Sequence, residues 1–139
     1  MDEIVSYLTR IPAWYLATID ADDPERPRVR PFSFAMESDG KLWFCTGRDK
    51  DVWHELEVHP KFELSGWEPG ESWIVVEGTA VLEDDDDVPE DVREAGFRHM
   101  IGLGEAHESS RDGRLAFLSV RDGRARFCDI DGSEQTVTF

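Results

Sequence analysis

Two alternating apolar runs, Val29–Met36 and Leu42–Cys45, flank a short turn at residues 38–41. Alternation with a period of two is typical of strands that bury one face. The turn contains Asp39-Gly40, a pair that tolerates the positive φ angles of tight hairpins. The segment therefore predicts a β-hairpin that supplies the second and third strands of a sheet.

Basic side chains stand at both ends of this predicted hairpin. Arg28 and Arg30 are two residues apart, so they project from one face of a strand. Thr46 and Lys50 follow the second run, where a helix is predicted to begin. Hairpin pairing would gather these groups, and such groups near a helix N-terminus suit a phosphate. The alternative is that both arginines are solvated and protect a strand edge from aggregation.

The rest of the chain predicts antiparallel strands with short helices in the connections. Helices are expected at 2–10, 49–59 and 89–101, with Asp49 as the N-cap of the second. Further strands are expected at 14–19, 62–67, 73–82, 115–120, 125–130 and 135–139, with a tight hairpin at 121–124 and either a bulge or a close backbone approach at Gly78. No βαβ alternation or glycine-rich nucleotide motif appears. We expect a mainly β fold: a single domain over 1–139 that forms a closed or partly closed antiparallel barrel of six or seven strands with peripheral helices.

The composition narrows the range of partners. A net charge of −16, from 31 acidic and 15 basic residues, disfavours a nucleic-acid or anionic-membrane surface. No apolar run approaches the ~18 residues of a membrane span, and no N-terminal signal appears, so we expect a cytoplasmic protein. The acidic run at 83–87 is expected to be a solvated loop rather than a metal site.

The cysteine, histidine and tryptophan residues show no spacing that indicates a metal site. Cys45 and Cys128 lie in apolar runs without metal-ligand spacing, so buried free thiols are expected, with a disulfide as the alternative. The histidines also lack ligand spacing and are expected at the surface or at helix caps: His54, His59, His99 and His107. Trp53 and Trp67 are expected in the core. Trp73 opens a strand, where its indole could contact a planar ring or simply pack at a rim.

The order and spacing of these segments resemble the pyridoxamine 5′-phosphate oxidase-like family of split β-barrels that bind flavin mononucleotide (FMN), and its small single-domain members in particular. The resemblance covers nearly the whole chain. It rests on the segments WYLATID, PRVRPF, DGKLWFCT, KDVWHEL followed by HP, WIVVEGTAVLED and RARFCDIDG.

The resemblance implies a homodimer that holds FMN in a groove between its subunits. The stretch from Arg30 through Pro31 to Phe32 would run along the cofactor, with Cys45 and Thr46 close to the flavin. The resemblance also implies that Lys50 would serve the phosphate and that Trp73 would reach the ring system from the partner chain. The charge geometry described above adds Arg28 to the phosphate position.

The implied activity is an FMN-dependent oxidation or reduction of an unidentified small molecule. Asp49 and Asp51 flank the phosphate position, and Val75 is apolar where relatives are often basic. The C-terminal segment that holds the vitamin in true pyridoxamine phosphate oxidases has no counterpart after Phe139, so a different substrate is expected. A deazaflavin or haem in the same groove, and a non-enzymatic binding or sensing module, are the alternatives.

Overall fold

β7 (Leu115–Asp129) runs through the middle of one eight-stranded antiparallel sheet in the computed structural model, which describes residues 1–139. It pairs with β6 (Ser72–Leu82) over most of its length, with β4 (Lys41–Gly47) through its first part and with β8 (Glu134–Thr138) through its last part. The other strands are β1 (Trp14–Ile19), β2 (Pro27–Phe32), β3 (Met36–Ser38) and β5 (Lys61–Glu68).

The sheet curls without closing. Its strand order is β2-β1-β5-β6-β7-β4-β3, with β8 joined to β7 beside this path. β2 and β3 are therefore the two ends of the path, although a connection of only three residues joins them in the chain. The expected mainly β fold of split-barrel type is confirmed, and the split lies next to the β2–β3 connection.

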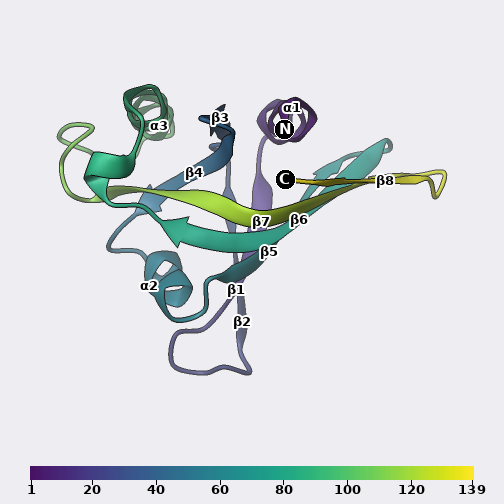
Figure 1. Cartoon of the computed structure of the whole chain (residues 1–139), viewed down its shortest axis with the longest axis horizontal. Coiled ribbons are helices and arrows are strands. Elements are labelled where there is room, and N and C mark those ends of the chain that lie inside the picture. The colour runs from purple at the N-terminus through teal and green to yellow at the C-terminus, as the bar shows by residue number, and fades with distance from the viewer.

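Three α-helices cover the sheet. α1 (Asp2–Arg10) and α3 (Glu90–Gly102) lie on one side of the long strands, and α2 (Asp51–Val58) lies on the other (Figure 1). A short 3₁₀ turn, Asp85–Asp87, precedes α3 within the acidic run. None of the helices combines the length and the apolar character that a membrane crossing requires.

The apolar interior has two parts. The larger cluster packs α1 and α2 against the sheet and includes Trp14, Phe44 and Leu64, all of them fully buried. The smaller cluster lies beneath α3 and includes Trp43 and Phe117. Burial of this apolar surface is the main stabilising term and fixes the three helices on the sheet.

The predicted central hairpin is only partly correct. The turn is present, with φ angles of 53° at Asp39 and 73° at Gly40, and it joins β3 to β4. The segment that carries the arginines does not belong to this hairpin, because β2 turns back on β1 and pairs with it from Pro27 to Phe32. Alternation alone does not identify the partner of a strand, and Arg28 and Arg30 belong to a different strand pair from Thr46.

The predicted second hairpin at 121–124 is wrong. Residues 115–129 form one strand, and both of its parts pair with β6. Asp122, with φ 54°, marks an irregularity in this strand, and the register shifts between Glu77 and Thr79 on β6. The bulge, one of the two alternatives expected at Gly78, is thereby confirmed. The turn-forming residues here bend a long strand rather than reverse it.

Smaller corrections concern helix ends and exposed apolar residues. α2 has Lys50 at its N-cap rather than Asp49. Trp67 was expected in the core, but its side chain is exposed. Trp53 is buried as expected, and the two cysteines are buried free thiols, as predicted.

Gly96 allows α3 to approach the sheet closely. A Cβ atom at Gly96 would lie 2.5 Å from Phe117 Cε1. We predict that Gly96→Ala lowers the free energy of unfolding by about 1–3 kcal/mol, because such a contact overpacks the core. Urea denaturation measures this change. Gly102→Ala in the same helix is the control: nothing lies within 4 Å of a Cβ there, so it should not destabilise the protein. Equal stability of the two variants would contradict the prediction.

Candidate functional site

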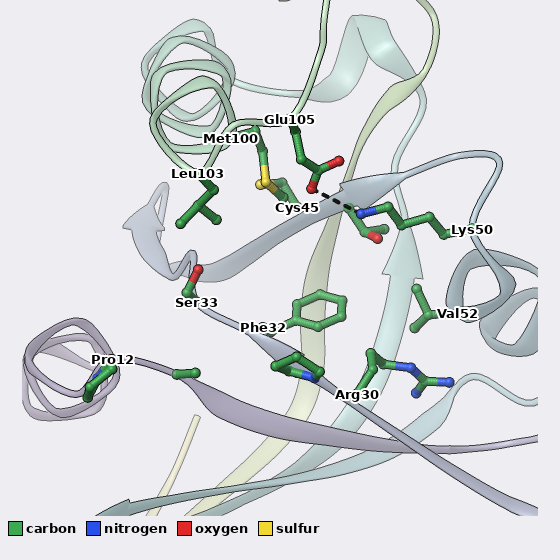
Figure 2. A pocket seen from close by; sticks show the side chains of 13 residues that line it. Pro12, Arg30, Phe32, Ser33, Cys45, Lys50, Val52, Met100, Leu103 and Glu105 are labelled. Carbon is green, nitrogen blue, oxygen red and sulfur yellow. Dashed lines mark hydrogen bonds and ion pairs between the residues drawn. The ribbon is translucent and has the colours of Figure 1, made fainter.

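A cavity of about 290 Å³ lies where the sheet is split. Its lining residues come from the α1–β1 link, β2 and the connection after it, β4, the start of α2, and the end of α3 with the segment that follows: Pro12, Ala13, Arg30, Pro31, Phe32, Ser33, Cys45, Thr46, Lys50, Val52, Met100, Leu103 and Glu105. Figure 2 shows aliphatic and aromatic side chains on its walls and charged side chains at one side. Six of the cofactor-binding residues expected from the sequence thus line one cavity.

Two strand edges border this cavity. β2 pairs only with β1, and β4 beyond Trp43 pairs only with β7, so each strand has one edge without a partner strand. Residues Arg30–Phe32 of β2 and Cys45–Thr46 of β4 line the cavity. Backbone groups on a free edge remain available to hydrogen-bond a ligand. The cavity therefore combines apolar walls with unused backbone donors and acceptors.

Lys50 is the cation that reaches furthest into this site. It occupies the N-cap of α2, where the helix dipole also favours a negative charge. Its Nζ donates to Glu105 Oε2 at 3.0 Å, and a dashed line marks this ion pair in Figure 2. Thr46 is buried beside it in the lining. The phosphate position expected from the sequence thus exists, with a carboxylate next to its lysine.

Arg30 is held by neighbours within the chain. Its Nη2 donates to the buried carboxylate of Glu55 on α2, and its Nη1 donates to Thr18 Oγ1 at 2.7 Å and to the Leu16 carbonyl at 3.1 Å. Thr18 Oγ1 in turn donates to Glu55 at 2.5 Å. The guanidinium is therefore largely satisfied where it stands, and it joins β2 to β1 and α2.

Arg28 and Trp73 lie outside the cavity. Arg28 Nε donates to Asp20 at 2.8 Å, and its side chain borders an adjoining hollow that shares Arg30 and Lys50 with the cavity. Trp73 lies on the outer face of the sheet, where it pairs with Trp67 across β5 and β6. Within one chain Trp73 does not meet the other predicted site residues, and its expected approach from a partner subunit stays a prediction.

Asp49 and Asp51 are next to Lys50 in the chain, and their negative charges would oppose the binding of a phosphate there. Asp49 lies 3.4 Å from Arg114 Nε, an ion pair that offsets part of its charge. Asp51 is exposed in the first turn of α2. Glu105, which the sequence analysis did not identify, is the carboxylate that forms an ion pair with Lys50, whereas neither Asp49 nor Asp51 does.

Cys45 has no thiolate character here. Burial, and then the charge of Glu105, raise the pKa of its thiol well above the ordinary range. A protonated, buried thiol is a weak nucleophile, so Cys45 contributes shape and polarisable surface to the cavity wall.

A serine–histidine pair on the cavity wall was not anticipated. Ser33 Oγ lies 2.7 Å from His99 Nε2, and Ser33 lines the cavity between β2 and β3. Burial lowers the pKa of the His99 imidazole, which favours its neutral form near pH 7. A neutral imidazole and a hydroxyl can exchange a proton with a polar ligand. Separation by 66 residues hid this pair from motif analysis.

His107 was expected at the surface, but its side chain is buried. Its Nδ1 lies 2.8 Å from Asp112 Oδ2, within the loop that joins α3 to β7. Burial opposes ionisation of Asp112, but hydrogen bonds from the Leu115 N–H, from His107 and from the Arg114 N–H outweigh it and lower the pKa of this carboxyl to about 2. The loop is thus held by an ionised, hydrogen-bonded aspartate.

An open antiparallel barrel with a cavity between two free strand edges defines the class of this protein, a split β-barrel. Residues 1–129 match the sequence profile described as pyridoxamine 5′-phosphate oxidase. The chain belongs to this family. A search of curated proteins finds no match.

Solved structures extend this comparison. A NimC/NimA family protein from Clostridium acetobutylicum is similar to the chain with a TM-score of 0.84 and 27% identity, over 100% of this chain and 92% of that one. A haem-binding protein from Mycobacterium smegmatis gives 0.66 and 13%, over 96% of this chain and 55% of that one. An F420 reductase gives 0.57 and 17%, over 84% and 90%. The last two likenesses concern the fold alone.

The buried ion pair predicts a stability difference between two glutamates of α2. We predict that Glu55→Gln lowers the free energy of unfolding by about 2–3 kcal/mol, because it leaves the Arg30 guanidinium partly buried without its counter-charge. Glu57→Gln removes the same charge from an exposed position on the same helix, where Glu57 contacts only His54. Its effect should stay below about 0.5 kcal/mol. Chemical denaturation checks both values, and matching losses would refute the distinction.

The lowered pKa of Asp112 implies that the stability of the protein depends on pH in the acid range. Its folded pKa of about 2 is below the ordinary value of 3.8, so its contribution to stability is complete above 3.8 and is lost as the pH falls toward 2. Asp112→Asn should therefore be less stable at neutral pH and lose less stability across that acid interval. Unfolding free energies measured at several pH values test this. Parallel pH profiles for Asp112→Asn and the wild type would exclude it.

Proposed function

We propose that the chain binds FMN in the cavity at the split of the barrel and uses it to oxidise or reduce a small organic molecule. The observation that carries this proposal is the position of Lys50: a lysine at a helix N-cap, beside the Thr46 hydroxyl, next to a cavity with free strand edges. This arrangement suits a ligand with a phosphate at one end and a flat, hydrogen-bonding ring at the other.

The cavity residues fit such a ligand in separate regions. Lys50 and Thr46 would hold the phosphate, while Phe32, Val52 and Met100 offer apolar surface to the ring system. The free edges of β2 and β4 supply backbone donors and acceptors for polar ring atoms. FMN, when bound, supplies hydride-transfer chemistry, and the protein contributes orientation and exclusion of water. Ser33 with His99 can hold a proton at the cavity wall.

A homodimer would complete this site. About 290 Å³ is at the lower limit of ligand pockets, which suggests that one chain forms only part of the wall. The outer face of the sheet carries three exposed aromatic side chains, Tyr15 at 54%, Trp67 at 65% and Trp73 at 40% exposure. Pro31 pairs with Tyr15 on this face and also lines the cavity, so the face extends to the cavity rim. Exposed aromatic patches of this kind favour subunit contacts.

Two other ligands merit direct comparison with FMN. The solved relatives include a protein described as haem-binding and one described as an F420 reductase, and both have the same fold. A lysine and a hydroxyl at a helix N-cap suit a phosphate better than they suit the propionates of haem, and this favours a phosphorylated flavin or deazaflavin. A binding or sensing module without turnover is the remaining candidate, and a ligand-bound protein with no redox activity would favour it.

Titration with FMN and riboflavin tests the phosphate assignment. We predict that Lys50→Ala weakens FMN binding by about 10- to 100-fold, the effect of losing one charge-assisted hydrogen bond, and changes riboflavin binding by less than about twofold. Flavin fluorescence or visible absorption measures both. Lys41→Ala is the control, because Lys41 pairs with Glu83 away from the cavity. Absence of FMN binding by the wild type, with haem or a deazaflavin bound instead, would overturn the proposal.

The exposed aromatic face predicts the oligomeric state. We expect a dimer in solution, and we expect Trp67→Glu to shift it toward monomer by placing a charge within the contact. Ile130→Glu, at an exposed apolar residue in the β7–β8 turn, is the control and should remain dimeric. Light scattering coupled to size exclusion reports the mass. A monomeric wild type would rule out a shared site.

A further inference from the structure

The carboxylate of Glu105 lies where three basic side chains converge. Lys50 Nζ lies 3.0 Å from Oε2, while Arg114 Nη2 and His107 Nε2 lie 3.6 Å and 3.9 Å from Oε1. No other carboxylate in the chain has ion-pair contacts with three basic residues; each of the other ion-paired carboxylates has one. The three basic groups come from the α2 N-cap and from two positions around the loop before β7.

This convergence has the form of an anion site. Arg offers a fork of donors, Lys a point charge and the imidazole a further N–H when protonated, and together they match the oxygens of a phosphate monoester. Asp112 is ionised and only accepts hydrogen bonds, so His107 Nδ1 carries the proton of that contact and Nε2 is left facing Glu105. Glu105 also lines the cavity, so its carboxylate stands inside the ligand space (Figure 2).

We propose that Lys50, Arg114 and His107 form a phosphate subsite that Glu105 occupies when no ligand is bound, and that a phosphorylated ligand enters by displacing this side chain. The identity of the ligand as FMN rests on the function proposed above, whereas the anion subsite rests on the geometry around Glu105. Arg114 and His107 thereby become ligand-contacting residues in addition to Lys50.

Displacement of Glu105 requires little rearrangement. The Lys50 and Glu105 side chains are partly exposed, and ion pairs of this kind change an equilibrium by only about two- to fivefold each. A glutamate side chain can rotate away while the Glu105 N–H keeps its 3.0 Å hydrogen bond to the Met100 carbonyl. A phosphate dianion carries more charge than a carboxylate, so it competes successfully for the same three groups.

Glu105 then sets the affinity of the site. When a site is open only part of the time, the apparent dissociation constant of its ligand equals the intrinsic constant divided by the fraction of time that the site is open. Removal of the Glu105 charge should open the site permanently. We predict that Glu105→Gln tightens FMN binding by about tenfold and leaves riboflavin, which lacks the phosphate, unchanged within about twofold.

Matched variants separate the effect of Glu105 on FMN affinity from the effect of a change in the net charge of the protein. Glu90→Gln removes the same charge from another ion pair of this region, the exposed Glu90–Arg111 pair. It should leave FMN affinity unchanged. In the Glu105→Gln background, Arg114→Gln should weaken FMN binding by about tenfold, and Arg111→Gln should not. Circular dichroism of each variant checks the fold, and Glu105→Ser repeats the test should Glu105→Gln fail to fold.

Inorganic phosphate separates this proposal from the assignment of FMN. Calorimetric titration with phosphate at constant ionic strength should give tighter binding to Glu105→Gln than to the wild type, and weaker binding once Arg114→Gln is added. If this holds and FMN does not bind, the subsite stands and the FMN assignment fails. If FMN binds the wild type but Glu105→Gln changes neither FMN nor phosphate affinity, the displacement by Glu105 is overturned and the FMN assignment stands.

Discussion

The buried ion pair between Arg30 and Glu55 determines how the cavity is assembled. β2 is an end strand with one partner, and α2 is a short helix on the opposite side of the sheet from α1 and α3. The pair, with Thr18 between its members, ties β2, β1 and α2 together. Since Lys50 is the N-cap of α2, the position of the candidate phosphate lysine follows from this contact. Arg30, which was expected to bind the cofactor, is thus mainly a structural residue that helps to position Lys50, the other candidate for ligand binding.

Charge pairing around the cavity explains how a strongly acidic chain can still offer an anion site. Each basic group there has an acidic partner in the absence of ligand: Asp20 for Arg28, Glu55 for Arg30 and Glu105 for Lys50. These pairs differ in burial, and therefore in how readily they open. The Arg30 pair is largely enclosed, whereas the Lys50 pair is partly exposed and faces the cavity. Selectivity for a ligand anion then depends on which pair is broken most easily.

Much of the fold could be predicted because it is encoded locally. Alternating runs and turn residues indicated most strands, and helical spacing indicated all three helices. The pairing of strands is not local. Val29–Met36 contains parts of β2 and β3, which lie at opposite ends of the sheet path, and the turn-like residues near Asp122 bend β7 instead of ending it. A sequence pattern records which face of a strand is buried, but it does not record which neighbour covers its edge.

The residues of the candidate site likewise fall into those that local sequence reveals and those that only the tertiary fold brings together. Lys50 and Thr46, and with them Arg28 and Arg30, were predicted from their chemistry. The family resemblance added Pro31, Phe32, Cys45 and Trp73. Glu105 and the Ser33–His99 pair were missed, because Glu105 and His99 reach the neighbourhood of β2 and β4 only through the packing of α3 and its following loop. Glu105 lies in an irregular segment with no periodic signal.

The free edges of β2 and β4 have a consequence for handling the protein. An uncovered strand edge is a template on which another chain can add, and charged side chains are one defence against such growth. Arg28 and Arg30 give β2 this defence, whereas the part of β4 at the cavity, Cys45–Thr46, is uncharged and is shielded only by its recessed position. A ligand in the cavity would cover both edges at once, so we expect ligand binding to reduce edge-to-edge association of the protein.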